Sequence, residues 1–273
     1  EALQMARDRG LDTTGATFYV TLEPCGHFGR TPPCTDSLIA SGVTRVVIGV
    51  IDPDERMNGK SIALLRAAGI EVDVGALSEA SAAMILGFSR AVGEGMPEVT
   101  CKAAMSLDGN IATTTGESKW ITGDLARGDG HQLRASHDAI LVGVGTLLAD
   151  DPALTCRSEL GMDPTPVILD THGRTPATAK IFSGTKTPIV LCAEDAVVDL
   201  PKARVVRISR SADGLDISAA LRALVELGLH HVLIEGGGAV HRSAFDANVV
   251  DTLHLYVAPV LIPGGKSWLG GTA

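Results

Sequence analysis

Aromatic side chains are scarce in this chain. Phe, Trp and Tyr make up only 3% of the 273 residues, whereas hydrophobic residues make up 45%. A chain of this length and composition can bury a full core in one large or two ordinary domains. That core must therefore be built from Val, Ile, Leu and Ala.

Long apolar runs and a positive net charge are also lacking. No stretch is as long and apolar as a membrane-spanning helix, and no signal peptide is recognisable. The formal net charge of −9 at pH 7 argues against non-specific nucleic-acid binding. We therefore expect a cytoplasmic protein without nucleic-acid or membrane partners, in which local Arg, Lys or backbone amides meet any phosphate ligand.

The cysteines do not form the pattern of a disulfide framework. There are five of them, an odd number, and they are unevenly spaced. This pattern favours reduced thiols, some of them on a metal ion. The first residue is Glu1, inside a helical pattern, and the last is Ala273, in a glycine-rich turn. Both ends therefore read as truncated.

Strand and helix patterns alternate in the first third of the chain. Strands are expected at 17–22, 45–51 and 70–74, with helices at 35–41 and 60–68, and an amphipathic helix follows at 78–92. This alternation predicts βαβ units with a largely parallel sheet. The Gly93–Pro97 segment, GEGMP, is the best linker candidate. We therefore predict domains at 1–92 and 98–273, joined by a linker at 93–97.

The pattern restarts after this linker. Strands are expected at 99–105, 137–144, 166–170, 188–192, 204–208, 231–235 and 253–261, with helices at 124–135, 217–227 and from about 239. The strand at 99–105 leads into a polar loop that ends at Trp120. Such loops bind ligands in α/β proteins, and a flat indole could cover a flat ligand. A β-hairpin with a core tryptophan is the alternative interpretation.

A loop with two cysteines separates the first strand from the next helix. Its sequence from 23 to 34 is EPCGHFGRTPPC, in which a proline precedes both Cys25 and Cys34. The prolines fix the backbone and present each thiol rigidly, and zinc accepts thiolate ligands. Zinc deaminases add a ligand and a proton shuttle from an upstream His-x-Glu. Two free or buried cysteines in a tight loop remain the alternative.

A triple glycine follows the strand VLIE at 232–235. Gly236, Gly237 and Gly238 could let backbone amides at a helix N-terminus approach a pyrophosphate. The motif is not GxGxxG, and a glycine turn that permits close packing is the alternative. If the amide of Gly237 cradles a pyrophosphate ligand, Gly237→Val should block that ligand and leave the melting temperature of the free protein nearly unchanged.

These motifs together resemble the bifunctional deaminase/reductase family of riboflavin biosynthesis. The resemblance runs through TLEPCGHFGRTPPC, Asp52-Pro53, Asn58-Gly59-Lys60, KAAMSLDGNIATTTGESKWIT, LLADDPALTCR and VLIEGGG. It implies an α/β chain with an N-terminally truncated cytidine-deaminase-like domain followed by a dihydrofolate-reductase-like domain. The family's His-Ala-Glu would lie before residue 1. We therefore expect Cys25 and Cys34 as zinc ligands, weak zinc binding, and no deamination by this chain.

The resemblance also implies the ligands of the second domain. That domain uses NADPH to reduce the ribosyl group of an aminopyrimidine phosphate to ribityl, and related reductases pair as homodimers. The implied substrate positions are Ser118, Arg134, Leu154, Arg157 and Glu235. The implied cofactor positions are Ala104, Trp120, Thr146, Asp150, Thr171, Gly237, Gly238, Ala239, Val240, His241, Arg242 and Ser243.

Arginines suit a phosphorylated substrate, although a surface salt bridge is the commoner role of any single arginine. Lys102 could polarise the sugar aldehyde or support the substrate, and a lysine that reaches solvent is the default alternative. Two other functions stay open. One is a dihydrofolate-reductase-like oxidoreductase of other specificity, and the other is a non-catalytic nucleotide-binding module.

Overall fold

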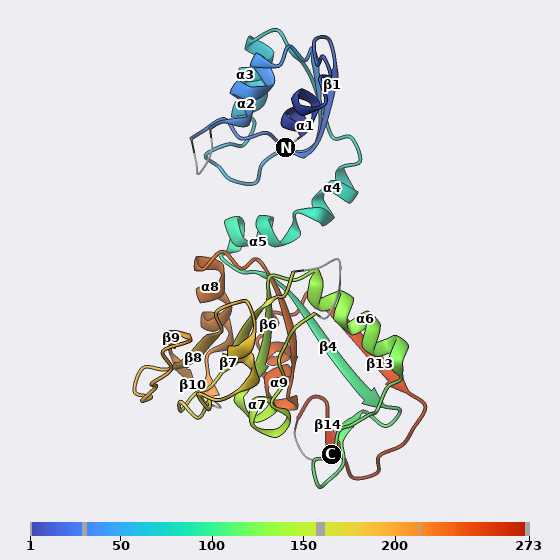
Figure 1. The fold of residues 1–273 in the computed structure, drawn as a ribbon, viewed down its shortest axis with the longest axis vertical. Helices are drawn as coiled ribbons and strands as arrows, with labels where there is room; N and C mark the ends of the chain where they lie inside the picture. Colours follow the sequence, from blue (N-terminus) through green and yellow to red (C-terminus); the bar gives the residue numbers. More distant parts are fainter. Residues whose placement is uncertain (1, 29–31, 157–161, 213, 271–273) are drawn as a thin grey trace. The chain divides into compact units, whose positions relative to one another are not determined.

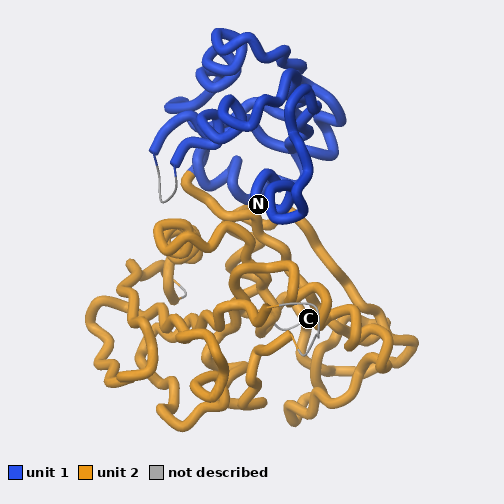
Figure 2. Tube along the Cα trace, turned by 45° about the horizontal axis from the view of Figure 1, so that its top comes forward, with its two compact units in different colours: residues 1–94 blue, residues 95–273 orange. Residues whose placement is uncertain are grey.

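The chain divides into two compact units. A computed structural model describes residues 2–28, 32–156, 162–212 and 214–270. The first unit is Glu1–Glu94 and the second is Gly95–Ala273 (Figure 2). Helix α5 (Leu86–Glu94) ends the first unit, and strand β4 (Glu98–Ser106) is the first strand of the second. Only residues 95–97 connect them.

The first unit is built on a three-stranded parallel sheet in the order β1-β2-β3. Its elements are α1 (Ala2–Asp8), β1 (Thr17–Leu22), α2 (Cys34–Ala40), β2 (Arg45–Val50), α3 (Lys60–Ala67), β3 (Glu71–Val74) and α4 (Ser78–Met84). Apolar residues from the central strand and from α2 and α3 form its core, including Ile48, Leu38 and Leu65. The βαβ organisation expected from the sequence is present.

One predicted helix is two helices in the structure. The segment expected as a single helix at 78–92 breaks at Ile85, where φ is −111°, outside the helical range. Helix α4 packs on β2 where Gly49 leaves room, because a Cβ there would lie 2.1 Å from Ser81 Oγ. Helix α5 then continues to Glu94.

The second unit is organised around a seven-stranded sheet (Figure 1). The strand order is β13-β4-β12-β6-β7-β8-β9, and every neighbouring pair is parallel. The other strands of this sheet are β6 (Ala139–Gly143), β7 (Thr165–Leu169), β8 (Ile189–Ala193), β9 (Arg204–Ile208), β12 (His231–Gly236) and β13 (Thr252–Ala258). The remaining elements are β5 (Asn110–Ala112), α6 (Asp124–Ala135), α7 (Val144–Asp150), η1 (Lys180–Ser183), β10 (Arg210–Ser211), β11 (Gly214–Leu215), α8 (Ile217–Glu226), α9 (Gly238–Asp246) and β14 (Lys266–Ser267).

The two faces of this sheet differ in chemistry. One face carries an apolar core under α8 and α9, to which Cys101, Leu141 and Ile234 contribute. The other face has an apolar core only under α7 and η1, built on residues such as Ile140 and Ile168. Over β13, β4 and β12 this second face meets α6 instead, and there the side chains are polar.

A charged cluster joins the amino ends of three adjacent strands. Asp138, just before β6, accepts hydrogen bonds from the amides of His230 and His231 at 2.8 and 2.9 Å, and its Oδ2 lies 3.2 Å from His231 Nδ1. His231 Nε2 lies 3.6 Å from Glu98 at the start of β4. The hydrogen bond to Asp138 raises the pKa of His231. Burial opposes the charge of Asp138, but His231 and the two amides lower its pKa to about 2.

Two local expectations differ from the structure. Helix α7 lies where the sequence suggested only an end to the strand at 137–144, and the strand stops at Gly143. The alternative interpretation of the segment after the strand at 99–105 was a β-hairpin with a core tryptophan. In the structure β5 pairs with β14 instead.

The core follows from the composition. No aromatic residue of the described ranges is among the buried hydrophobic ones, which are aliphatic, Cys or Met. None of the helices in those ranges has the length and apolar composition needed to span a lipid bilayer.

Candidate functional site

Helix α6 rests on the sheet through charged groups. The only buried residue of this twelve-residue helix is Gly130. Figure 1 shows α6 alongside β4 and β13. An ordinary amphipathic helix would cover this surface with apolar side chains. The polar contacts below α6 therefore mark the candidate site.

Glu235 lies at the centre of these contacts. It is the fifth residue of β12, and its side chain is only 6% exposed. Arg134, near the end of α6, donates from Nε to Oε1 at 2.8 Å and from Nη2 to Oε2 at 2.7 Å. Burial alone would raise the pKa of Glu235, but Arg134 and Lys102 outweigh it and hold the pKa below its ordinary value. Glu235 is therefore a carboxylate in a buried, two-pronged ion pair.

Arg134 also connects this pair to the loop after α7. Its Nη1 donates to the carbonyl oxygen of Thr155 at 3.0 Å. Burial opposes its charge, but Glu235 more than offsets this, so the pKa of Arg134 is raised. The three bonds use three of the five N–H donors of a guanidinium. Within the described residues, this leaves two donors that could face a ligand.

Lys102 completes the charged group from the neighbouring strand. Ile234 pairs with Cys101, so the next residues along, Glu235 and Lys102, are neighbours on the same face. Lys102 Nζ lies 3.5 Å from Glu235 Oε2, and the lysine side chain is 19% exposed. The amine is therefore held inside the site. The default interpretation, a lysine that extends to solvent, is wrong.

The glycines after β12 have different surroundings. A Cβ on Gly236 would lie 2.7 Å from Val142 Cβ, and one on Gly238 would lie 2.4 Å from the amide nitrogen of Gly270. These two positions are thus glycine because chains pack closely there. Gly237 is different, since its hypothetical Cβ meets only Thr146 Oγ1, at 3.3 Å.

Gly237 also has a positive φ of 76°. Side chains with a Cβ rarely adopt this conformation, and β-branched ones least of all. The expectation that Gly237→Val leaves the free protein's melting temperature unchanged is therefore wrong. The backbone itself requires glycine here, whatever binds next to it.

The stretch after Gly237 forms the first turns of α9. Val240 and His241 are buried, and His241 Nδ1 lies 3.0 Å from the carbonyl oxygen of Trp268. Burial lowers the pKa of His241. Ala239 and Arg242 are exposed, and Ser243 is half-buried. A ligand at this helix start would meet backbone amides, because the first N–H groups of a helix lack acceptors within it.

Other implied cofactor positions gather at the same edge of the sheet. The strands β12, β6 and β7 are neighbours and parallel, so their carboxyl ends share one edge. Gly237 follows β12, Thr146 lies in the first turn of α7 after β6, and Thr171 follows β7. Ligands of α/β sheets bind at this edge. Asp150 is half-buried and ends α7, and Ala104 lies on β4 beside Tyr256.

The loop before α6 carries two more implied positions. Ser118 is half-buried, whereas Trp120 is 72% exposed. The guanidinium carbon of Arg127 lies 4.5 Å from the centre of the Trp120 ring, a cation–π distance. The ring therefore stands at the surface beside the start of α6.

The last two implied substrate positions lie after α7. Leu154 is 3% exposed and contributes its side chain to the core under α7. Its φ is 55°, so the backbone turns sharply there. Only backbone atoms of Leu154 could meet a substrate. Arg157 lies outside the described residues.

In the first unit, the two predicted zinc ligands are brought together. Cys25 Sγ and Cys34 Sγ are 3.1 Å apart, and the amide of Cys34 donates to Cys25 Sγ at 3.2 Å. Burial, followed by the neighbouring Cys25, raises the pKa of Cys34. Two converging thiols at the start of α2 fit the ligand preference of zinc. Within the described ranges, no group of three His, Cys, Asp or Glu residues could hold a metal ion.

A buried carboxylate organises the loop beside this thiol pair. Glu23 is 3% exposed and accepts hydrogen bonds from the amides of Asp52, Gly59 and Ser61 at 3.2, 2.8 and 3.0 Å. These bonds tie the end of β1 to the loop at 52–61. Sequence reasoning did not single out Glu23.

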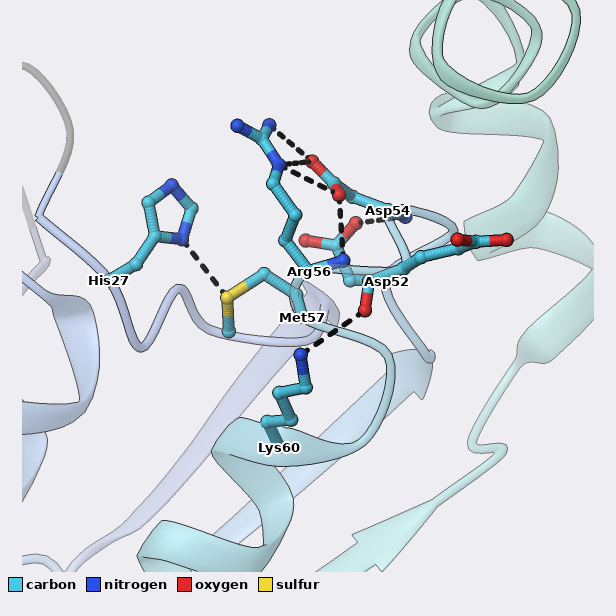
Figure 3. A network of polar contacts seen from close by, with 7 residues as sticks. His27, Asp52, Asp54, Arg56, Met57 and Lys60 are labelled. Atoms are coloured by element: carbon cyan, nitrogen blue, oxygen red, sulfur yellow. Dashed lines mark hydrogen bonds and ion pairs between the residues drawn. The ribbon is translucent and has the colours of Figure 1, made fainter.

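Polar contacts continue through that loop (Figure 3). His27 Nδ1 lies 3.0 Å from Met57 Sδ, so the imidazole is directed at Met57. Arg56 pairs with Asp54 and, through this hydrogen bond, lowers the pKa of Asp54 to about 2. Burial raises the pKa of Asp52. The loop therefore carries two carboxylates whose pKa values are shifted in opposite directions.

Comparisons with known proteins agree on one family. The model of the RibD C-terminal domain matches residues 97–273, and that of the cytidine and deoxycytidylate deaminase zinc-binding region matches residues 1–50. Riboflavin biosynthesis protein RibD of Bacillus amyloliquefaciens is 43% identical over 256 residues, which cover 92% of this chain and 69% of that protein.

The chain belongs to the RibD family.

Solved structures extend this RibD assignment to the fold. The deaminase/reductase from Thermotoga maritima, described as a diaminohydroxyphosphoribosylaminopyrimidine deaminase and 5-amino-6-(5-phosphoribosylamino)uracil reductase, is 36% identical with a TM-score of 0.87. It covers 99% of this chain, which in turn covers 75% of that chain. The riboflavin biosynthesis reductase Rib7 of Saccharomyces cerevisia shares the reductase fold, with a TM-score of 0.55 and 23% sequence identity. This match covers 70% of this chain and 86% of the Rib7 chain.

RibD members are enzymes of riboflavin biosynthesis that join a zinc-binding deaminase domain to an NADPH-dependent reductase domain. In this chain the reductase domain, which is dihydrofolate-reductase-like, is matched along its length, and the deaminase domain is matched in part. The expected family and fold class are thus confirmed. The roles of the individual site residues stay predictions.

Sequence reasoning missed two residues of the charged site. Tyr256 Oη donates to Asp129 Oδ2 at 2.6 Å, and the Tyr256 ring faces Lys102. A usable signal was the alternation in β13, where Leu253, Leu255 and Val257 are exposed and Tyr256 lies on the opposite face. Nothing in the sequence indicates that this face meets Asp129.

Proposed function

We propose that the second unit reduces the ribosyl group of 5-amino-6-(5-phosphoribosylamino)uracil to ribityl with NADPH. The observation that carries this proposal is the largely buried cluster of Lys102, Glu235 and Arg134, which takes the place of an apolar core below α6. Placing three charged side chains away from most solvent costs free energy, so such a cluster is a candidate functional site. Relatives that include the Thermotoga maritima enzyme support the choice of substrate.

The reaction requires one hydride and one proton. The sugar is joined to the pyrimidine through nitrogen, so breaking the C1′–O4′ bond leaves C1′ doubly bonded to that nitrogen. Bound NADPH, held at the carboxyl edge of β12, β6 and β7 by the residues proposed below, would supply the hydride that C1′ takes up. O4′ takes the proton and becomes a hydroxyl group. Lys102 Nζ is the proton donor that we assign, and Glu235 keeps the ammonium close to the sugar.

Substrate recognition falls to the residues around Arg134. Its two uncommitted N–H donors could hold an oxygen of the sugar or of the phosphate. Ser118, Arg157 and the backbone at Leu154 are proposed as further substrate contacts. Because Glu235 orients Arg134 through two bonds, the guanidinium is pre-positioned and little side-chain entropy is lost on binding.

The cofactor is proposed to lie along the carboxyl edge of β12, β6 and β7. Gly237 and the first amides of α9 provide donors for its phosphate groups, and the position of Thr146 beside Gly237 supports this choice. Ala104, Trp120, Asp150, Thr171 and the remaining residues from Gly238 to Ser243 complete the proposed contacts. The side chains of Val240 and His241 are buried, and we propose that only their backbone takes part in phosphate binding.

In the first unit, Cys25 and Cys34 are proposed to hold zinc. The ion would supply a bound water for deamination of an aminopyrimidine phosphate when the whole ligand set is present. The closeness of the two thiols supports this assignment. The burial of Glu23 below them suggests that the protein holds the loop in place.

We further propose a homodimer that works in the cytoplasm, where thiols stay reduced. The outward face of the edge strand β13 supports pairing through the reductase sheet. Leu253, Leu255 and Val257 on that face are 42%, 39% and 49% exposed. An apolar row on a sheet edge is a common site of association.

Loss of absorbance at the nicotinamide band tests the function. NADPH should be consumed with the deaminated pyrimidine phosphate and not with dihydrofolate. Lys102→Met should lower the rate by about 100-fold, as expected for loss of a general acid. Lys186→Met, at an exposed loop position, is the control.

Consumption with dihydrofolate alone would point to another reductase. Binding of NADPH without turnover of either substrate would point to a non-catalytic module.

A further inference from the structure

We propose that Tyr256 and Asp129 form a positioning pair that holds the amine of Lys102 for the reduction. This inference rests on the proposed function, because it concerns the same site. Tyr256 lies on β13 and Asp129 on α6, so the pair joins the edge of the sheet to the helix above it.

The first step is the contact between Tyr256 and Lys102. His254 pairs with Lys102, and Tyr256 pairs with Ala104, so Tyr256 is the diagonal neighbour of Lys102 on the same face. Lys102 Nζ lies 5.9 Å from the centre of the Tyr256 ring. Aromatic faces attract ammonium groups at this distance.

The second step is the position of the amine between two attractions. Glu235 Oε2 is 3.5 Å from Nζ, which is longer than the 2.7–2.9 Å typical of a closed ammonium–carboxylate bond. The Tyr256 ring attracts the amine from β13, which lies on the other side of β4 from β12. We infer that the ring keeps the amine from closing fully onto Glu235, which leaves its protons available to a substrate oxygen.

The third step is the fixation of the ring itself. Tyr256 Oη donates to Asp129 Oδ2 at 2.6 Å. Burial, and then Asp129, raises the pKa of Tyr256, so the phenol stays a donor at the pH at which the enzyme works. One Tyr side chain therefore has its hydroxyl tied to α6 and its face toward Lys102.

Tyr256 is only half-buried, so core packing alone does not fix its ring. The residue also lines an open pocket of about 240 Å3 together with residues 121–123, Ala126 and residues 257–259. A specific hydrogen bond therefore helps to keep the ring in one orientation. Asp129 provides that bond.

Helix α6 closes the third side of the lysine. A Cβ on Gly130 would lie 3.6 Å from Lys102 Cε, so the lysine stem runs close to this glycine of α6. Gly130 follows Asp129 directly. The same helical turn thus confines the stem of Lys102 and holds the ring that faces its amine.

Several charged and titratable groups face the amine from the elements packed around it. Glu235 comes from β12, His254 and Tyr256 from β13, and Arg134 and Asp129 from α6. Of these groups, Glu235 and the Tyr256 ring are the two in contact with the amine of Lys102. Removing the Tyr256 ring should therefore change the position of the Lys102 amine and leave the net charge of the site unchanged.

The test compares Tyr256→Leu, Tyr256→Phe and Asp129→Asn in the full chain. Steady-state oxidation of NADPH with the deaminated pyrimidine phosphate gives kcat and KM. Tyr256→Leu should lower kcat by about tenfold, the size of effect expected for a cation–π contact away from water, with KM nearly unchanged. Tyr256→Phe keeps the ring and should lose about two- to threefold, and Asp129→Asn should behave like it.

A second readout does not depend on turnover. Acylation of Lys102 by a water-soluble ester at a single pH, followed by mass spectrometry of the peptide, reports how far the amine is free of Glu235. Lys102 should react several-fold more slowly in Tyr256→Leu than in the unchanged chain, because without the ring the amine closes onto Glu235. Tyr19→Phe, which alters the exposed tyrosine of the first unit, is the matched control and should change neither readout.

Each outcome decides the proposal. A lower kcat with slower acylation in Tyr256→Leu supports it, whereas faster acylation overturns it, provided that the melting temperature of Tyr256→Phe stays within a few degrees of the parent. Unchanged kcat and acylation in Tyr256→Leu overturn the positioning role while the proposed function stands. If the unchanged chain does not oxidise NADPH with this substrate, the proposed function and this inference both fall.

Discussion

Replacing Glu235 by Gln removes the only negative charge that contacts both Arg134 and Lys102 among the ion pairs of the described chain. Each of these cations has a side chain that is 19% exposed. Removing one partner of a buried ion pair costs about 3–5 kcal/mol. Gln still accepts one hydrogen bond, so we expect the lower end, about 3 kcal/mol.

Thermal unfolding of the second unit measures this effect. The unit spans roughly 180 residues, and for this size each kcal/mol shifts the melting temperature by about 2–4 °C. Glu235→Gln should therefore lower the transition by about 6–12 °C. Glu226→Gln, at an exposed position on α8, makes the same chemical change and should shift it by no more than about 2 °C.

The stabilisation by Glu235 should also depend on pH. The pKa of Glu235 in the folded protein is below its ordinary value of 4.5. Its contribution to the free energy of unfolding is thus fully present above pH 4.5 and is lost as the pH falls through the folded pKa. The gap between the parent and Glu235→Gln should narrow in acid. Equal melting temperatures at neutral pH, or a gap that does not narrow, would refute the reasoning.

Three further changes test other parts of the structure. Gly237→Val should lower the melting temperature of the free protein, since a positive φ costs a side chain about 1–3 kcal/mol, and it should abolish the rise in melting temperature that NADPH induces in a thermal-shift assay. Asp138→Asn should lower the free energy of unfolding most between pH 3.8 and 6.5 in urea titrations, because the pKa of Asp138 is lowered and that of His231 is raised. In Glu23→Gln an amide group faces three backbone donors, so the first unit should lose about 2–3 kcal/mol and its loop at 52–61 should exchange hydrogen faster. The first argument fails if Gly237→Val melts at the temperature of the parent. The second fails if the destabilisation by Asp138→Asn does not depend on pH. The third fails if the amides of the loop at 52–61 exchange at the same rate in Glu23→Gln.

Much of the fold could be predicted because most elements have regular apolar periodicity. The strand at 17–22 and the helix at 124–135 lie where the sequence placed them. Helix α7 was missed because its apolar residues continue those of β6 and because Asp151-Pro152 reads only as a breaker. The pairing of β5 with β14 joins segments far apart in the sequence, which periodicity cannot reveal.

The site was predictable only in part, for a similar reason. Glu235 could be placed at the end of a strand, and the resemblance to a known family indicated Arg134. Their ion pair, however, joins residues 101 positions apart, and the bond between Tyr256 and Asp129 joins residues 127 positions apart. The φ of Gly237 and the packing of Gly238 against Gly270 likewise depend on the folded backbone.

The strand order has a consequence for the synthesis of this protein. Strand β4 is made first in its sheet, yet its two neighbours, β12 and β13, are made last. Roughly 150 residues separate the end of β4 from the end of β13, which a ribosome translates in on the order of 8 to 30 s. Until β12 is made, β4 has unpaired backbone groups on both edges, while residues 1–94 of the first unit have already been synthesised. A nascent chain stalled before β12 should therefore be the form that aggregates and that binds chaperones.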